Sequence, residues 1–68
     1  MKFVKLHRNG GEVLVNMGFV TEAYNFTDEN SHRKGILYFN FEVDGMQACI
    51  KVDESLDEIY EKLSGNGE

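Results

Sequence analysis

Apolar and polar residues alternate on both sides of two short glycine turns, and this pattern predicts two β-hairpins. Asn9-Gly10 suits the first turn, because a type I′ turn needs positive φ at both central residues. Gly11 would also allow a three-residue loop. Pairing outward from the two-residue turn gives an apolar face with Leu6 opposite Val13 and Val4 opposite Val15, and a second face with His7 opposite Glu12, Lys5 opposite Leu14 and Phe3 opposite Asn16.

The second hairpin is predicted around Asp44-Gly45, which has the same turn chemistry. A slip of one residue would exchange its two faces, so the pattern and the turn favour one register. The apolar face then pairs Val43 with Met46, Phe41 with Ala48, Phe39 with Ile50 and Leu37 with Val52. The polar face pairs Glu42 with Gln47, Asn40 with Cys49 and Tyr38 with Lys51.

A helix is predicted directly after this hairpin. Ser55 and Glu58 have the spacing of a capping box, in which each side chain binds a backbone N–H at the start of the helix. Because a helix of about two and a half turns is marginal alone, we expect it to pack on the strands. Its apolar stripe has the helical spacing i, i+3, i+4 and i+7 and consists of Leu56, Ile59, Tyr60 and Leu63.

A middle strand is predicted between the hairpins, over Phe19 to Phe26, entered through a tight turn at Asn16 to Gly18. Its alternation is less regular, because Glu22 shares a face with Val20, Tyr24 and Phe26. The segment from Thr27 to Gly35 is polar throughout and is predicted to be a loop.

The order of elements, β-β-β-loop-β-β-α, indicates an α+β fold. We expect a small curved antiparallel sheet of about five strands, or a small open barrel, with one C-terminal helix over its apolar face. Residues 1–64 are predicted to form a single small domain, and residues 65–68 a frayed C-terminal tail. A chain of 68 residues builds only a small core.

The single cysteine, Cys49, excludes an intrachain disulfide, and the clustered Cys and His residues of a structural zinc site are missing. No run reaches the ~18 to 20 apolar residues that span a bilayer, and the N-terminus lacks the apolar segment of a signal peptide. We therefore expect a cytoplasmic protein with a reduced thiol and no membrane insertion.

Charge is distributed unevenly along the chain. Residues 1–43 carry five acids and five bases, whereas residues 44–68 carry seven acids and two bases, so the net charge of −5 lies in the second part. Phosphate backbones are bound by clustered Lys and Arg, which makes nucleic acid an unlikely partner. The acidic segment is expected to be a solvated helix face, or otherwise a docking surface for a basic partner.

The residues that could carry chemistry do not form a recognisable catalytic or metal-binding pattern. His7 and His32 lie far apart in the sequence, and Cys49 is expected to be an incidental small residue, although Lys51 could lower the pKa of its thiol. A calcium loop starting at Asp28 would need glycine where Arg33 stands and glutamate at position 39. We therefore expect no catalytic, cofactor-binding or metal-binding residues and no enzymatic activity.

The order of these signals resembles the small flagellar FlbD-like family of bacterial proteins over roughly residues 2–63. The residues that carry the resemblance are Asn9-Gly10, Val15-Asn16, Asp44-Gly45 and the run from Val52 to Ile59. The chain departs from the family pattern at Gly18, Phe19 and Tyr24, and its loop from Thr27 is longer. The resemblance implies a non-enzymatic bacterial cytoplasmic protein, linked in some members to flagellar operons or motor function, with no established catalytic residues.

One short helix cannot cover both faces of the sheet. Either the sheet curls into a barrel that buries some of the remaining apolar side chains, or these side chains form an interface with another subunit or a partner. The predicted interface, for homo-oligomerisation or for an unknown protein partner, consists of Phe3, Leu14, Phe19 and Tyr38. The alternative is a nucleic-acid-associated regulatory module, loosely similar to half of a LytTR-type domain, with phosphate contacts from Arg8, Arg33 and Lys34.

Overall fold

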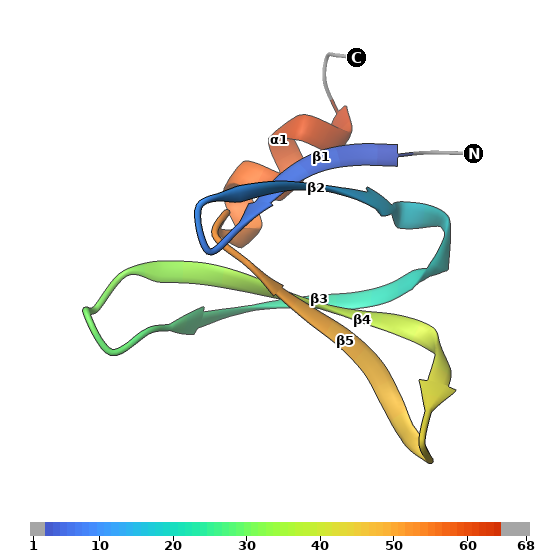
Figure 1. The fold of residues 1–68 in the computed structure, drawn as a ribbon. Coiled ribbons are helices and arrows are strands. Elements are labelled where there is room, and N and C mark those ends of the chain that lie inside the picture. Colours follow the sequence, from blue (N-terminus) through green and yellow to red (C-terminus); the bar gives the residue numbers. More distant parts are fainter. Residues whose placement is uncertain (1–2, 65–68) are drawn as a thin grey trace.

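The computed structural model describes residues 3–64, which contain five strands, one short 3₁₀ helix and one α-helix (Figure 1). In chain order these are β1 (Phe3–Arg8), β2 (Gly11–Asn16), η1 (Met17–Phe19), β3 (Val20–Thr27), β4 (Arg33–Val43), β5 (Met46–Val52) and α1 (Leu56–Ser64). The predicted α+β class, with two hairpins and a C-terminal helix, is confirmed. The tail predicted at residues 65–68 lies outside the described residues.

The strands divide between two antiparallel sheets, β1-β2 and β3-β4-β5, which remain open. The division occurs at η1, where the Asn16 side chain accepts a hydrogen bond from Gly18 N at 3.0 Å and the chain turns away from β2. The inner faces of the two sheets and one side of α1 enclose a common core (Figure 1). Its buried members are Val4, Leu6, Val15, Leu37, Val52 and Ile59.

The first hairpin has the predicted register at every pair, from Phe3 opposite Asn16 to His7 opposite Glu12. Asn9 and Gly10 both have positive φ, at 54° and 84°, as a type I′ turn requires. The apolar inner face and the mixed outer face therefore follow directly from the turn chemistry.

The second hairpin has the predicted register only near its turn, at Val43 with Met46 and Glu42 with Gln47. Farther from the turn the prediction is wrong by two residues, because Leu37 pairs with Ile50 instead of Val52. Three residues of β4 face one residue of β5 in a bulge between these regions, and the Gln47 side chain donates to the Phe39 carbonyl there at 3.0 Å. A shift of two residues keeps every side chain on its predicted face.

The polar loop is shorter than predicted, since β3 extends to Thr27 and β4 begins at Arg33. The ladder pairs Thr27 with Arg33 and continues inward to Gly35, so polar residues form the end of this hairpin. Asp28 closes the remaining loop, because its carboxylate accepts hydrogen bonds from the backbone N–H groups of Asn30 and His32 at 2.9 and 2.8 Å.

The faces of β3 differ from the prediction because the strand register shifts between Val20 and Glu22. Val20 and Ala23 pack against the core, whereas Tyr24 lies exposed. The register shift exchanges the inward-facing and outward-facing positions along β3. A strict two-residue alternation does not predict such an exchange.

The capping box of α1 is confirmed. Ser55 N donates to the Glu58 carboxylate at 2.8 Å, and Glu58 N donates to the Ser55 hydroxyl at 3.4 Å. Ile59 is buried in the core, but Tyr60, predicted in the same apolar stripe, is 69% exposed. The helix is attached at both ends by polar contacts, from Leu56 N to the Asn25 side chain and from Lys62 Nζ to the Lys5 carbonyl.

Candidate functional site

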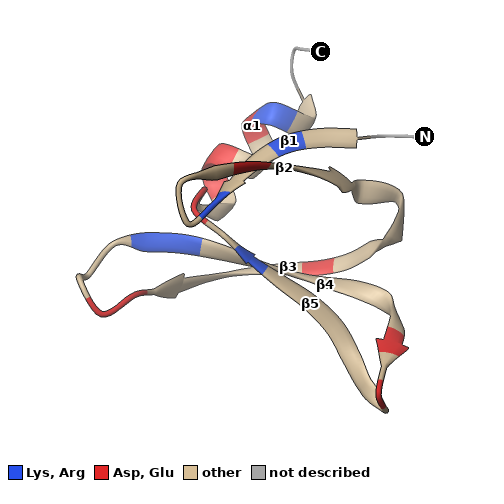
Figure 2. Cartoon of the chain, viewed as in Figure 1, with Lys and Arg blue, Asp and Glu red and all other residues tan. Residues whose placement is uncertain are grey.

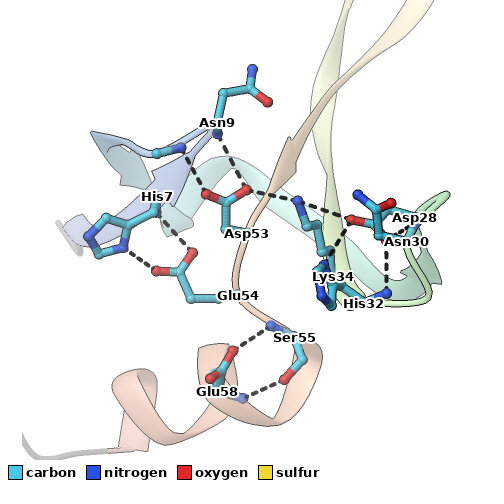
Figure 3. A network of polar contacts seen from close by, with 11 residues as sticks. His7, Asn9, Asp28, Asn30, His32, Lys34, Asp53, Glu54, Ser55 and Glu58 are labelled. Atoms are coloured by element: carbon cyan, nitrogen blue, oxygen red, sulfur yellow. Dashed lines mark hydrogen bonds and ion pairs between the residues drawn. The ribbon is translucent and has the colours of Figure 1, made fainter.

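A buried carboxylate connects the first hairpin with the link between β5 and α1 (Figure 3). Glu54 is only 8% exposed, and its carboxylate accepts hydrogen bonds from His7 N at 2.9 Å and from His7 Nδ1 at 2.6 Å. Burial by itself would raise the pKa of Glu54, but the hydrogen bonds from the ring and the backbone of His7 outweigh it and lower the pKa. Glu54 therefore remains a structural anion.

Asp53 extends this network to the first turn and to the loop (Figure 3). Its carboxylate accepts hydrogen bonds from Gly10 N at 3.1 Å and Asn9 N at 3.3 Å, and contacts Lys34 Nζ at 3.4 Å. The bond from Gly10 is the main cause of the lowered pKa of Asp53. Lys34 also contacts Asp28 at 3.4 Å, and the hydrogen bond with Asp28 is the main cause of its raised pKa.

A polar hollow of about 550 Å³ lies beside this network. Arg8 and Lys51 line it, and Lys51 Nζ lies 5.2 Å from the centre of the Phe26 ring. Neither base has a carboxylate within ion-pair distance among residues 3–64. Three acids also line it. Asp28 and Asp53 are engaged by backbone N–H groups and Lys34, whereas the third, Glu29, lies in the exposed loop.

The residues considered for chemistry lie in separate places. His7 contacts Glu54, His32 contacts Asp28 at 3.6 Å, and Cys49 is exposed. In the described part of the chain, no three His, Cys, Asp or Glu residues are arranged to hold a metal ion.

The four predicted interface residues lie on three separate surfaces. Phe3 and Leu14 are exposed on the outer face of the β1-β2 sheet. Phe19 is half-exposed in η1, whereas Tyr38 is partly buried and packs edge-to-face on Tyr24, with ring centres 5.9 Å apart. The prediction placed them on one sheet face, and the division into two sheets separates them.

A group of exposed apolar side chains instead lies in η1 and toward the turn of the β4-β5 hairpin. We call it the hairpin patch and define it by Phe19, Phe41, Val43 and Met46, each at least 46% exposed. The rings of Phe19 and Phe41 meet edge-to-face with centres 6.2 Å apart, and Val43 pairs with Met46.

Three of these residues, Phe41, Val43 and Met46, were predicted on the apolar face of the hairpin, which the helix was expected to cover. Strand length is the signal that could have corrected this assignment. β4 has 11 residues, whereas the strands of the first hairpin have only 6, so the smaller sheet cannot cover the whole of β4.

A second apolar feature, which we call the α1-β3 groove, is a hollow of about 700 Å³ between the helix and the edge strand. Met17, Val20, Ala23, Leu56, Tyr60 and Leu63 provide most of its apolar lining. Glu22 and Asp57 are the charged residues at its edge. The sequence showed the apolar side of the helix but could not show that a hollow remains between this side and β3.

None of the helices within residues 3–64 is long and apolar enough to cross a membrane. Comparisons of the chain with protein-family models, with curated proteins and with solved structures found no match. The resemblance to the FlbD-like family therefore stays a prediction.

Proposed function

We propose that this chain is a non-enzymatic protein-interaction module of the cytoplasm that self-associates through the hairpin patch. The observation that carries the proposal is the exposure of four large apolar side chains in η1 and near the β4-β5 turn, where Phe19 meets Phe41 and Val43 pairs with Met46. Isolated exposed apolar residues are ordinary, but a contiguous patch is typical of an interaction site.

The patch adjoins the core of the fold through a stack of two rings. The rings of Phe39 and Phe41 stack with centres 5.5 Å apart, and Phe39 packs against the core. A docking surface that is already ordered loses little conformational entropy on binding. The patch is therefore ready to associate without rearrangement.

A second copy of the chain is the occupant that fits this surface. None of the four patch residues is charged, so the patch has no charge by which to select an acidic or a basic partner. Glu42 lies on the opposite face of its strand, and Asp44 lies at the turn. A twofold axis would place the same uncharged surface on both sides of the contact.

The expected dimer is weak. Four such residues expose on the order of 400 Å² of apolar surface, about half of the ~800 Å² that each partner contributes to a standard interface. The net charge of −5 on each copy also opposes close approach. Because salt screens this repulsion, we expect added salt to strengthen the association.

Light scattering after size-exclusion chromatography, over a range of concentrations, tests the proposal. We expect the mass of the unmodified protein to rise with concentration, and Met46→Lys and Val43→Lys to remain monomeric. Leu14→Lys is the matched control, because Leu14 is 66% exposed and Met46 is 74% exposed, but Leu14 lies on the outer face of β1-β2.

A monomer at every concentration would contradict self-association. Loss of association in Leu14→Lys, with association retained in Met46→Lys, would move the interface to the outer face that includes Phe3. Circular dichroism of each variant excludes unfolding as the cause.

A nucleic-acid-associated role is the alternative proposal. Arg8 and Lys51 beside the polar hollow favour it, whereas Lys34, one of its expected phosphate contacts, is held by Asp28 and Asp53. Fluorescence anisotropy with short single-stranded and double-stranded DNA and RNA at low salt tests this role. No binding under those conditions would remove it.

A further inference from the structure

We propose that the α1-β3 groove binds an extended segment of another protein in which apolar residues alternate with Lys or Arg, and that this segment pairs with β3 as an added strand. The groove is separate from the hairpin patch, so this inference goes beyond the self-association proposed above.

The shape and lining of the groove fit apolar side chains. Its volume of about 700 Å³ lies within the usual range of binding pockets. β3 contributes Val20 and Ala23, and α1 contributes Ile59, Tyr60 and Leu63. Alternate side chains of an extended segment would point into this space, because successive residues of a strand face opposite sides.

The wall formed by β3 has unused backbone groups. β3 is the outer strand of its sheet, and no strand within residues 3–64 pairs along its other edge. The helix approaches this strand at Asn25, where the side chain accepts a hydrogen bond from Leu56 N at 2.9 Å. The segment from Val20 to Ala23 lies farther along and borders the groove. An open strand edge is the usual site for strand addition by a peptide.

Charge indicates which segment would bind. Glu22 and Asp57 line the groove, no base lines it, and neither acid forms an ion pair within the described chain. The charge of Glu22 is also the main cause of the raised pKa of the Tyr24 hydroxyl, which lies close to the Glu22 carboxylate. Lys or Arg residues between the apolar positions of a partner would meet these carboxylates.

The same charges argue against a second copy in the groove. The end of the hairpin that holds the patch also carries acids, Glu42 on the opposite face of its strand and Asp44 at the turn. Figure 2 shows acidic segments at this end, and they would come near Glu22 and Asp57 if this end of a second copy entered the groove. Like charges in contact disfavour that pairing. A basic segment from a different protein therefore suits the groove better than this chain does.

Titration with a short synthetic peptide that alternates lysine and valine tests the inference. The titration uses the full chain with ¹⁵N labelling and Met46→Lys, so that self-association does not interfere. We expect saturable chemical-shift changes concentrated at Val20 to Ala23 and along the groove side of α1. A peptide that alternates glutamate and valine should not bind, and N-methylation of alternate peptide nitrogens should abolish binding by removing the strand hydrogen bonds.

Matched variants show whether the groove itself is responsible. Glu22→Lys should weaken binding roughly tenfold, since it replaces an attraction by a repulsion. Glu29→Lys makes the same charge change in the exposed loop and should leave affinity within about twofold. Tyr60→Ala removes an exposed groove side chain while keeping a helix-forming residue, and it should also weaken binding.

Three results would overturn the inference: no saturable binding, shifts centred away from the groove, or equal loss in Glu22→Lys and Glu29→Lys. Equal binding of the N-methylated peptide would overturn strand addition. None of these outcomes depends on dimerisation, which the light-scattering experiment measures with the hairpin-patch variants.

Discussion

Glu54 and His7 are joined by two hydrogen bonds although 47 positions separate them in the chain. The backbone and the ring of His7 both donate to the same carboxylate, and Asp53 N donates to the His7 carbonyl at 2.6 Å. These contacts attach β1 to the segment that leads into α1. They hold together the two sheets that the chain does not join by strand pairing.

Replacing Glu54 should weaken the whole domain. We expect Glu54→Gln to reduce the free energy of unfolding by about 1–3 kcal/mol, because a buried site loses charge-assisted hydrogen bonds. Urea denaturation followed by circular dichroism measures the change. Glu61→Gln, at an exposed position in α1, serves as the control and should stay within about 0.5 kcal/mol of the original protein. Equal stability of the two variants would contradict the role assigned to Glu54.

Acid should destabilise the fold in a defined range of pH. The pKa values of Glu54, Asp53 and Asp28 are lowered from ordinary values of 4.5, 3.8 and 3.8. A carboxyl group with a lowered pKa stabilises the folded state above its ordinary pKa, and this contribution is lost as the pH falls through the folded-state value. Unfolding free energy should therefore change little above about pH 5 and decrease below about pH 4.5.

Urea midpoints between neutral pH and about pH 2.5 would show this decrease. In Glu54→Gln the dependence on pH should be shallower, because one of the three groups no longer titrates. An unchanged slope in that variant would show that Glu54 does not contribute to acid sensitivity.

Gly35 should not tolerate a side chain. A Cβ atom there would lie 2.7 Å from the Glu54 carbonyl oxygen and 3.0 Å from Ile59 Cδ1. We expect Gly35→Ala to destabilise the fold by about 1–3 kcal/mol, since backbone and core must move apart. Gly11→Ala is the control, because its Cβ would meet only the Arg8 carbonyl, at an ordinary 3.6 Å. Thermal unfolding compares the two variants, and similar melting temperatures would contradict the close packing around Gly35.

The capping box should contribute measurably to stability. Ser55→Ala removes the hydroxyl that accepts a hydrogen bond from Glu58 N, and we expect a loss of about 1 kcal/mol. Ser64→Ala changes a serine in the last turn, whose hydroxyl donates only to the Tyr60 carbonyl, so it should have little effect. Chemical denaturation of the two variants compares the start and the end of the same helix. If Ser64→Ala lowers the free energy of unfolding as much as Ser55→Ala does, the capping box does not stabilise the helix in the way proposed.

Sequence patterns predicted local structure well where turn chemistry and side-chain alternation act together. Asn9-Gly10 determined every pair of the first hairpin, whereas Asp44-Gly45 determined only the pairs next to its turn. The bulge in β4 depends on a side-chain contact from Gln47 to the Phe39 carbonyl, which has no signature in the alternation. Thr27 and Arg33 are polar but pair with each other in the sheet, so the polarity of the segment predicted a loop that is too long.

The surfaces were less predictable than the elements, because exposure depends on which strands share a sheet. Phe41 and Val43 have the spacing of core residues and become exposed only because the opposing sheet is shorter. In the sequence, Glu54 is one of several acids near the start of the helix, and nothing there marks it as buried. Its burial depends on the fold, which brings His7 beside it. Long-range neighbours of this kind do not appear in a local pattern.

The contacts of Asp53 and Glu54 with the first turn and His7 also determine when the domain can form during synthesis. The ribosome makes the first hairpin early, but the residues that hold it in place come 47 positions later. Until then Ile59, which packs in the same core as Val4 and Leu6, is absent. We expect the nascent chain to leave the apolar side of β1 partly uncovered, and therefore open to chaperone binding, until residues 53–59 emerge.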